Sequence, residues 1–447
     1  MNSFGYLPHT MENREKMLQT IGKTSTLDLF ADIPEDVLLD RPLDLPEAQS
    51  EWALLKDLKA LSMKNKNVDD VISLIGCGFY QHYIPSVVDA MISRSEFYTS
   101  YTPYQPEISQ GILQAIFEYQ TLVARLFGQD VSNASLYDGP TALGEAALMA
   151  CAQTRRERVV VSRAVHPEYR EVLRTYASGQ RVAVAEVGLK DGQTNLDQLE
   201  AMLTDDVAAV VVSYPNFFGM IEDIQHIAQL VHSKNALLIV ATYPIALGIL
   251  EAPGNLGADI VVAEGQSLGN LLSYGGPSLG MIATKGALVR RLPGRIAGQT
   301  KDHEGRRGFV LTLQAREQHI RREKASSNIC SNQALNALAA SIYLAYMGPQ
   351  GLAEVARQCT AKAHYAAKVL EKVGVKPIFS GPFFNEFVVH VNNAAAVLPK
   401  LQNDGILFGQ LLDRFYSEMS NDIVLAFTEI HTKEQIDFVA QRLEALV

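Results

Sequence analysis

Short β-branched runs alternate with stretches of helical periodicity from about Val71 onward. The runs are RVVVSR (158–163), VAVAEV (182–187), VAAVVVSY (207–214), ALLIVAT (236–242), DIVVAE (259–264) and LGMIAT (279–284). Near-continuous apolar strands separated by helices are typical of a parallel sheet that is covered on both faces. The pattern therefore predicts a large α/β domain over residues 71–324.

The two ends of the chain have different patterns. Residues 1–70 are charged and helix-prone with several prolines, which favours an arm that packs on the body and contributes to an interface. From Ala325 a helical pattern runs to Gly348, where the glycine is expected to stop it. Strand-like FNEFVVHV and NDIVLAFT follow, and a final helix is expected from Thr432 onward. We predict a bridging helix and a smaller α+β domain over residues 325–447.

Composition excludes several classes of protein. The chain has 447 residues and a net charge of -10, which argues against nucleic acid as a partner. Its longest apolar run, 236–250, is interrupted by Thr242 and Pro244, so no membrane span is expected. The start lacks the features of a signal or transit peptide, which favours the cytoplasm. The four cysteines are widely spaced, so we expect reduced thiols and no metal centre.

A lysine is missing where the pattern leads one to expect it. Residues 236–284 contain none, and the next is Lys285. The segment has the order of the cofactor-binding half of an aminotransferase-like domain: an apolar strand, a turn, GADIVVAE and a Gly-rich GGPSLG. In working enzymes of that type a lysine after the GADIVV-like strand holds pyridoxal phosphate as a Schiff base. Here the slot reads Gly265-Gln266-Ser267, and the carboxamide of Gln266 is not a usable nucleophile.

Other cofactor contacts are absent or ambiguous. The strand that normally ends in an aspartate, to pair with the pyridinium nitrogen, has Ala241 and Thr242 there. In SLYDGPTALGEAALMA the helix start after Asp138 has free N–H groups for a phosphate, although an ordinary Asp138 cap explains the same pattern. His166 stands before a helix, where it either faces a pyridine ring or simply caps and packs.

Two further segments are candidates for binding. The aromatic loop FYTSYTPYQPEISQG has no amphipathic period and carries Tyr98, Tyr101, Tyr104 and Glu107, so it forms the wall of a pocket or packs in an interface. Between Lys285 and Lys324 there are eleven basic and four acidic residues, a local balance of +7 in a chain of net -10. Such a segment is either a solvated face or a surface that attracts an acidic partner or a phosphate.

Several phrases together resemble the N-terminal half of the glycine cleavage system P-protein, which in some bacteria is a separate α subunit. They include YTPYQPEISQG, NASLYDGPTA, YPNFFGMIED, AEGQSLG and the long, specific REQHIRREKASSNICSNQALNALAA. The resemblance implies the aminotransferase-like fold type I. It also implies an α2β2 complex whose related β subunit carries the Schiff-base lysine and pyridoxal phosphate. The implied reaction converts glycine and the lipoyl group of the H-protein to carbon dioxide and an aminomethylated arm.

The resemblance also suggests roles for residues of this chain. Tyr98, Tyr101, Tyr104 and Glu107 would line the pocket of the neighbouring β subunit. Ser326, Ser327 and Asn328 would approach its phosphate region, and the basic segment, with Arg316, Arg321, Arg322 and Lys324, would receive the acidic lipoyl protein. Two alternatives stay open: a self-sufficient enzyme that uses Lys285 or another lysine, and a structural or regulatory pseudoenzyme that touches no substrate.

Overall fold

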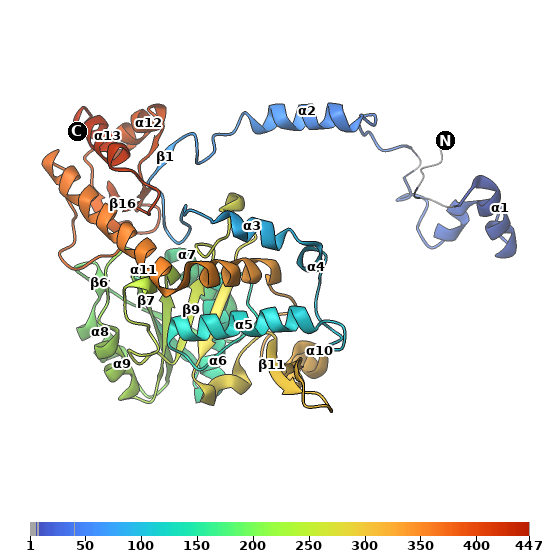
Figure 1. Ribbon diagram of the computed structural model, residues 1–447, viewed down its shortest axis with the longest axis horizontal. Coiled ribbons are helices and arrows are strands. Elements are labelled where there is room, and N and C mark those ends of the chain that lie inside the picture. The colour runs from blue at the N-terminus through green and yellow to red at the C-terminus, as the bar shows by residue number, and fades with distance from the viewer. Residues whose placement is uncertain (1–5, 7–8, 40, 447) are drawn as a thin grey trace. The chain divides into compact units, whose positions relative to one another are not determined.

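A computed structural model describes residues 6, 9–39 and 41–446 (Figure 1). The chain divides into two compact units, residues 1–66 and residues 67–447. The first division lies close to the end of the predicted arm at residue 70. The boundary expected at residue 324 falls inside the second unit.

The second unit is built on a seven-stranded sheet. Its strand order is β2-β10-β9-β8-β7-β3-β4, with β2 (Val131–Ser132), β3 (Arg158–Ser162), β4 (Ala183–Val187), β7 (Val207–Tyr214), β8 (Leu237–Thr242), β9 (Ile260–Glu264) and β10 (Gly280–Thr284). The strands from β9 to β4 are parallel, whereas β10 is antiparallel to both of its neighbours. The predicted strands are confirmed, but LGMIAT does not continue the parallel sheet, because no helix crosses over between β9 and β10.

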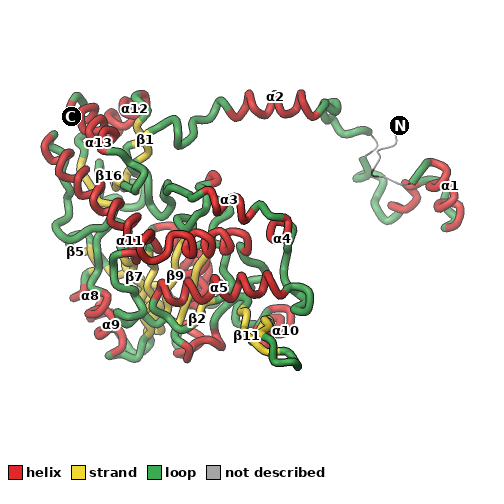
Figure 2. Tube along the Cα trace, viewed as in Figure 1, coloured by secondary structure: helices red, strands yellow, loops and turns green. Residues whose placement is uncertain are grey.

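Helices cover both faces of this sheet (Figures 1 and 2). On one face lie α6 (Gly139–Thr154) and α7 (Pro167–Gly179), and on the other lie α5 (Gln110–Phe127), α9 (Ile224–His232) and the first part of α11 (Ala334–Lys372). Successive side chains of a strand point to opposite faces, so Val210 and Val212 of β7 join one core while Ala209 and Val211 join the other. Every residue of β7 is buried, as two-sided coverage requires.

The C-terminal part forms a second layer around the end of α11. It has an antiparallel sheet of β13 (Glu386–His390), β16 (Asp422–Ala426) and β15 (Gln410–Leu411), packed against α12 (Ala394–Asn403) and α13 (Lys433–Glu444). Thr432 caps α13 as predicted. The short β1 (Ile72–Ser73) pairs with β14 (Ile406–Leu407), so the chain enters the second unit beside its C-terminal part.

The bridging helix differs from its prediction at its start. It begins at Ala334, not at Ala325, and α11 consists of two helical segments that meet at a kink at Gly348. The late start has a local cause: the hydroxyl of Ser327 accepts a hydrogen bond from the backbone N–H of Ile329, 3.0 Å away, and such side-chain contacts compete with helical hydrogen bonds. Gly348 has a φ of 59° and a ψ of -176°, which are not helical angles, so the first helical segment ends there as predicted and a second one follows.

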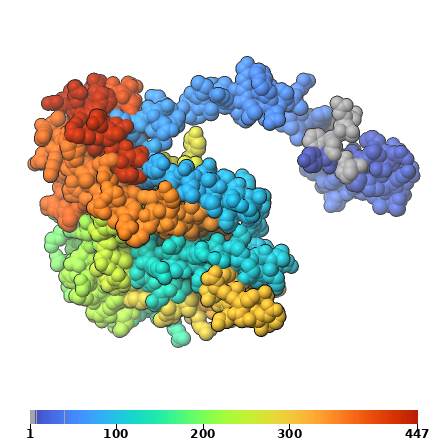
Figure 3. Space-filling view, in the orientation of Figure 1, coloured from blue at the N-terminus to red at the C-terminus, as the bar shows by residue number. Residues whose placement is uncertain are grey.

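The remaining elements are short. They are α3 (Ser86–Ile92), α4 (Ser95–Tyr98), β5 (Leu189–Lys190), β6 (Gln193–Thr194), α8 (Leu196–Met202), β11 (Ile296–Lys301), β12 (Arg307–Thr312) and α10 (Gln318–Arg321). The hairpin of β11 and β12 projects from the body (Figures 1 and 3). Among the described residues, no helix has the length and apolar character needed to cross a membrane.

The described residues of the first unit bury no side chain. Its elements are α1 (Met11–Thr20), η1 (Thr26–Phe30) and α2 (Glu51–Ser62), and none of them buries a residue. Many of its apolar side chains are exposed, including Trp52, Leu55, Leu58 and Leu61 of α2. Helices with so much exposed apolar surface are typical of an interaction surface.

Candidate functional site

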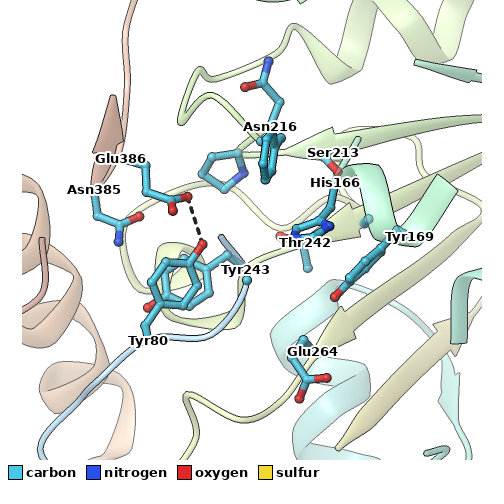
Figure 4. A pocket seen from close by; sticks show the side chains of 14 residues that line it. Tyr80, His166, Tyr169, Ser213, Asn216, Thr242, Tyr243, Glu264, Asn385 and Glu386 are labelled. Atoms are coloured by element: carbon cyan, nitrogen blue, oxygen red, sulfur yellow. Dashed lines mark hydrogen bonds between the residues drawn. The ribbon is translucent and has the colours of Figure 1, made fainter. Parts of the chain in front are cut away.

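A cavity opens at the carboxyl ends of the parallel strands, the edge at which α/β sheets bind their ligands (Figure 4). β7, β8 and β9 contribute the residues at or next to their last positions. The lining residues are Gly78, Tyr80, His166, Tyr169, Ser213, Pro215, Asn216, Phe217, Ala241, Thr242, Tyr243, Glu264, Asn385 and Glu386. The central sheet, the loop before α3 and the C-terminal part therefore meet at this site.

Gln266 lies beside this cavity, and both ends of its carboxamide are engaged. Its Oε1 accepts a hydrogen bond from the backbone N–H of Tyr80 at 3.0 Å, and its Nε2 donates to the carbonyl of Asn270 at 2.9 Å. The side chain is buried. Gln266 therefore acts as a structural tie between β9 and the loop that carries Tyr80, and its nitrogen has no reactive lone pair to offer.

Glu264 places an internal carboxylate at the N-terminus of α6. Its Oε2 accepts from the N–H of Gly139 at 3.0 Å. Its Oε1 accepts from the N–H groups of Gln266 and Leu279, at 2.9 and 3.1 Å, and from the Ser278 hydroxyl. Because a helix N-terminus attracts anions, Glu264 occupies the position that the sequence offered to a phosphate. Burial raises the pKa of Glu264 to about 7, against the opposing effect of these hydrogen bonds.

This role of Glu264 was not predicted from the sequence. A glutamate that ends a fully buried strand is the signal that was available, since such a charge needs several donors. Asp138 behaves as the ordinary cap that the sequence also allowed, because its carboxylate accepts from the N–H of Thr141 at 2.8 Å.

A second buried acid, Glu386, closes the opposite wall of the cavity. It accepts from the Tyr80 hydroxyl at 2.9 Å, as Figure 4 shows, and from the N–H of Cys77 at 2.8 Å. Burial raises the pKa of Glu386 to about 7. The C-terminal part thus contributes a polar group that the sequence analysis did not identify as a site residue.

Behind Tyr80 lies a buried chain of hydrogen bonds that joins three distant segments. The Nδ1–H of His82 donates to Glu429 at 2.6 Å, and the Nε2 of His82 accepts from the Tyr243 hydroxyl. The rings of Tyr243 and Tyr80 pack with their centroids 4.4 Å apart. This network fixes the loop before α3 against both η2 (Pro244–Gly248) and the C-terminal part.

His166 has a capping and packing role, one of the two roles that the sequence allowed. Its Nδ1 accepts from the N–H of Glu168 at 3.1 Å and its Nε2 donates to the carbonyl of Cys77 at 2.8 Å. Burial lowers the pKa of His166. Both ring nitrogens are committed within the chain.

The residues around the cavity do not fit pyridoxal phosphate. No lysine amine is present in the slot of Gln266, and the end of β8 offers Ala241 and Thr242 where an acid would pair with the pyridinium nitrogen. Glu264 already takes the first N–H of α6. The cavity volume is about 60 Å³, whereas ligand pockets measure roughly 300–1,000 Å³. The chain's own side chains thus fill most of the space that a cofactor needs.

Lys285 cannot substitute for the missing lysine. Its Nζ pairs with Asp259 Oδ1 at 2.7 Å. In the antiparallel pairing of β10 with β9, Thr284 lies opposite Ile260, whereas the site begins at Glu264, which lies opposite Gly280. Four residues of strand separate the two ends, about 13 Å. The geometry therefore excludes the self-sufficient enzyme based on Lys285.

The aromatic loop does not join this cavity. Tyr98, Tyr101 and Tyr104 are 68%, 74% and 68% exposed, and Glu107 is exposed as well. Tyr98 and Tyr101 border a separate apolar hollow between α5 and the start of α11. None of these four residues lines the cavity, so a catalytic role for them would require another chain.

The three residues predicted for the phosphate region, Ser326, Ser327 and Asn328, differ in burial. Ser327 is half-buried close to Glu145 of α6, while Ser326 and Asn328 are exposed. Of the four cations predicted for docking, Arg316 donates to the carbonyls of Leu292 and Gly294, and Arg321 donates to that of Ala315. Arg322 and Lys324 are exposed.

The four cysteines are free thiols, as expected.

Comparison with known proteins decides the family. The family model for the glycine cleavage system P-protein matches residues 5–443. The chain belongs to this family. It is 53% identical to the probable glycine dehydrogenase (decarboxylating) subunit 1 of Carboxydothermus hydrogenoformans, with 98% of this chain and 99% of that protein covered. It is 55% identical to the protein of the same name from Geobacillus thermodenitrificans, with 97% of each covered.

Solved structures agree with this P-protein membership. An inhibitor-bound glycine decarboxylase (P-protein) of the glycine cleavage system superposes with a TM-score of 0.91 at 44% identity, covering 99% of this chain and 100% of that one. A cysteine desulfurase from Thermococcus onnurineus superposes with a TM-score of 0.62 at 16% identity, over 85% of this chain and 95% of that one. That second similarity shows the fold alone. The predicted aminotransferase-like fold type I is confirmed.

Proposed function

We propose that this chain is the α subunit of a two-subunit glycine decarboxylase. In the complex, a related β subunit holds pyridoxal phosphate on its own lysine. The complex decarboxylates glycine and transfers the aminomethyl group to the lipoyl arm of the H-protein, as an α2β2 assembly in the cytoplasm. The single observation that carries the proposal is Gln266, whose carboxamide is tied at both ends in the slot where the family's chemistry needs an amine.

The arm supports the need for a partner. Its helices bury no residue, and Trp52, Leu55 and Leu58 of α2 are 73%, 58% and 52% exposed. Burying a leucine side chain stabilises by roughly 1.5–3 kcal/mol, so contact of these side chains with another surface would stabilise the arm. The relatives are named as a first subunit, and that name implies a second.

The aromatic loop supports a contribution to the partner's site. Its three exposed tyrosines and Glu107 belong to neither core of this chain. The phenol groups offer donors and flat apolar faces at low cost in conformational entropy. We assign Tyr98, Tyr101, Tyr104 and Glu107 to the wall of the partner's pocket, Ser326 and Asn328 to its phosphate region, and the exposed Arg322 to the surface that receives the lipoyl protein.

The experiment that tests the proposal is an exchange assay between glycine and labelled bicarbonate. Each subunit is assayed alone and then with the other, in the presence of lipoylated H-protein and pyridoxal phosphate. Exchange that requires both subunits supports the proposal. Exchange by this chain alone contradicts it.

A second assay separates a contributor to the site from a purely structural subunit. The double variant Tyr101→Phe, Tyr104→Phe removes two hydroxyl groups with little change of shape. The matched control, Tyr83→Phe with Tyr346→Phe, removes two hydroxyls from other exposed tyrosines. We expect the first pair to lower the turnover of the complex about tenfold while assembly is unchanged, because one lost hydrogen bond to a reacting group is worth about 1–2 kcal/mol. Equal turnover for both pairs would favour the structural pseudoenzyme.

A further inference from the structure

Eight residues line a further cavity, distinct from the two already described. Its lining is strongly basic, in contrast to the acidic chain as a whole. Its volume is about 380 Å³, and its walls are Arg290, Arg291, Leu313, Ala315, Arg316, Arg321, Lys324 and Ser326. Five of these are cationic and none is acidic, although the whole chain carries a net charge of -10. We call it the basic cavity.

The charges of the basic cavity are not neutralised by the chain itself. The side chains of Arg290, Arg291 and Lys324 make no ion pair or hydrogen bond within the described residues. Arg316 and Arg321 are bonded only to backbone carbonyls, including that of Gly294 at 2.7 Å and that of Ala315 at 2.9 Å. These carbonyl contacts fix the two guanidinium groups in place without cancelling their charge. Burial lowers the pKa of Arg316, against the opposing effect of the neighbouring Glu317 carboxylate.

Converging like charges destabilise a structure unless an anion joins them. We propose that the basic cavity binds a small molecule that carries phosphate groups. Arginine side chains suit this ligand because the planar guanidinium donates two parallel hydrogen bonds to phosphate oxygens. Leu313 and Ala315 provide apolar contacts for the rest of the molecule.

The shape of the site favours a small ligand over an acidic protein surface. Its volume lies within the range of roughly 300–1,000 Å³ that small-molecule pockets occupy. A raised or flat charged surface would suit a protein partner, whereas these side chains surround a hollow. The proposal goes beyond the proposed function and does not depend on it, since the site belongs to this chain alone.

The chain contains a matched pair of variants for the test. Arg290→Ser with Arg291→Ser removes two charges from the wall of the basic cavity. Arg306→Ser with Arg307→Ser removes two adjacent charges from the β11–β12 hairpin, whose residues do not line the cavity. Both variants change the net charge equally, so any nonspecific effect of charge is the same in each.

Calorimetric titration of the purified full chain with inorganic pyrophosphate, at constant ionic strength, measures binding directly. We expect saturable binding at one site, weakened at least about tenfold by the cavity pair and less than about threefold by the hairpin pair. Lys324→Gln is a second cavity variant, with the same direction expected, in case the double variant fails to fold. Acetate and chloride serve as control anions and are expected not to compete.

Three results would overturn the proposal. One is the absence of saturable pyrophosphate binding. Another is an equal loss of affinity in the cavity and hairpin pairs, which would show attraction by net charge alone. The third is tighter binding of poly-glutamate than of pyrophosphate, with the same dependence on Arg290 and Arg291, which would assign the site to an acidic protein.

Discussion

We expect the substitution Glu145→Gln to stabilise the folded chain, and we expect this gain in stability to grow as the pH rises. Glu145 is a buried residue of α6, 5% exposed, and burial raises its pKa from 4.5 to about 7, while the nearby Ser327 hydroxyl lowers it. A carboxyl group with a raised pKa in the folded state binds protons that the unfolded chain releases. Stability is therefore lost as the pH rises from about 4.5 to about 7, and the loss is complete above that range.

The size of the effect follows from the two pKa values. The difference between 4.5 and about 7 corresponds to about 3 kcal/mol at high pH, because one pKa unit equals about 1.4 kcal/mol. At about pH 5.5 only about 1 kcal/mol of the penalty has developed. Glutamine has nearly the same shape, never ionises, and its carbonyl oxygen still accepts from Ser327. The expected gain for Glu145→Gln is thus about 1 kcal/mol at about pH 5.5 and about 3 kcal/mol at about pH 8.5.

Urea unfolding at the two pH values measures this gain through the midpoint and slope. Glu118→Gln makes the same change of formal charge on an exposed residue of α5, and it is expected to alter stability by less than about 0.5 kcal/mol. A gain for Glu145→Gln that is equal at both pH values would refute the electrostatic reasoning. Destabilisation at about pH 8.5 would refute it as well, since it would mean that the ionised carboxylate is satisfied in the folded chain.

Three further predictions concern the site and the arm. Tyr243→Phe removes the hydroxyl that donates to His82, and we expect it to lower the free energy of unfolding by about 1–3 kcal/mol in thermal melts. The control is Tyr343→Phe: the buried hydroxyl of Tyr343 has no partner among the described residues, so its removal is expected to be neutral or stabilising. Equal losses for the two variants would contradict the role of the network. Gly139→Ala places a Cβ against the Tyr169 hydroxyl and 3.0 Å from the backbone nitrogen of Glu264, so we expect a loss of about 1–3 kcal/mol in the free energy of unfolding. An unchanged melting temperature would show that the packing at the start of α6 is loose. The triple variant Leu54→Ser, Leu58→Ser, Leu61→Ser is expected to weaken association with the second subunit at least about tenfold in sedimentation analysis. The control is the double variant Lys56→Ser, Lys59→Ser, and the melting temperature of the lone chain is expected to stay unchanged. Association at full strength would mean that α2 lies outside the interface.

Local patterns predicted the sheet well, because each buried strand is a near-continuous apolar run with a clear turn at its end. The bounds of β7 match their prediction in full, and Thr432 caps α13 as expected. The direction of β10 was missed because strand direction depends on the connection, and GQSLGNLLSYGGPS contains only a single short 3-10 turn and no α-helix to cross the sheet. The helix start at Ala334 was missed because serine side chains redirect the backbone before it.

The site was predictable in one respect only. The absence of an amine at Gln266 is visible in the sequence, since it follows from residue type alone. Its contact with Tyr80 is not visible, because the two residues are 186 positions apart in the chain. Other contacts of the site are equally distant in sequence: His82 meets Glu429 across 347 residues, and Cys77 meets Glu386 across 309. The role of Glu264 at the start of α6 likewise needs the fold, because only the sheet brings the end of β9 to Gly139.

Reductive trapping of the cofactor in the assembled complex tests the central claim most directly. The two subunits are purified together with pyridoxal phosphate, reduced with borohydride, digested and analysed by mass spectrometry for lysines that carry the reduced cofactor. The account predicts a modified lysine on the second subunit and none on this chain. A stoichiometric adduct on Lys285, or on any other lysine of this chain, would contradict it.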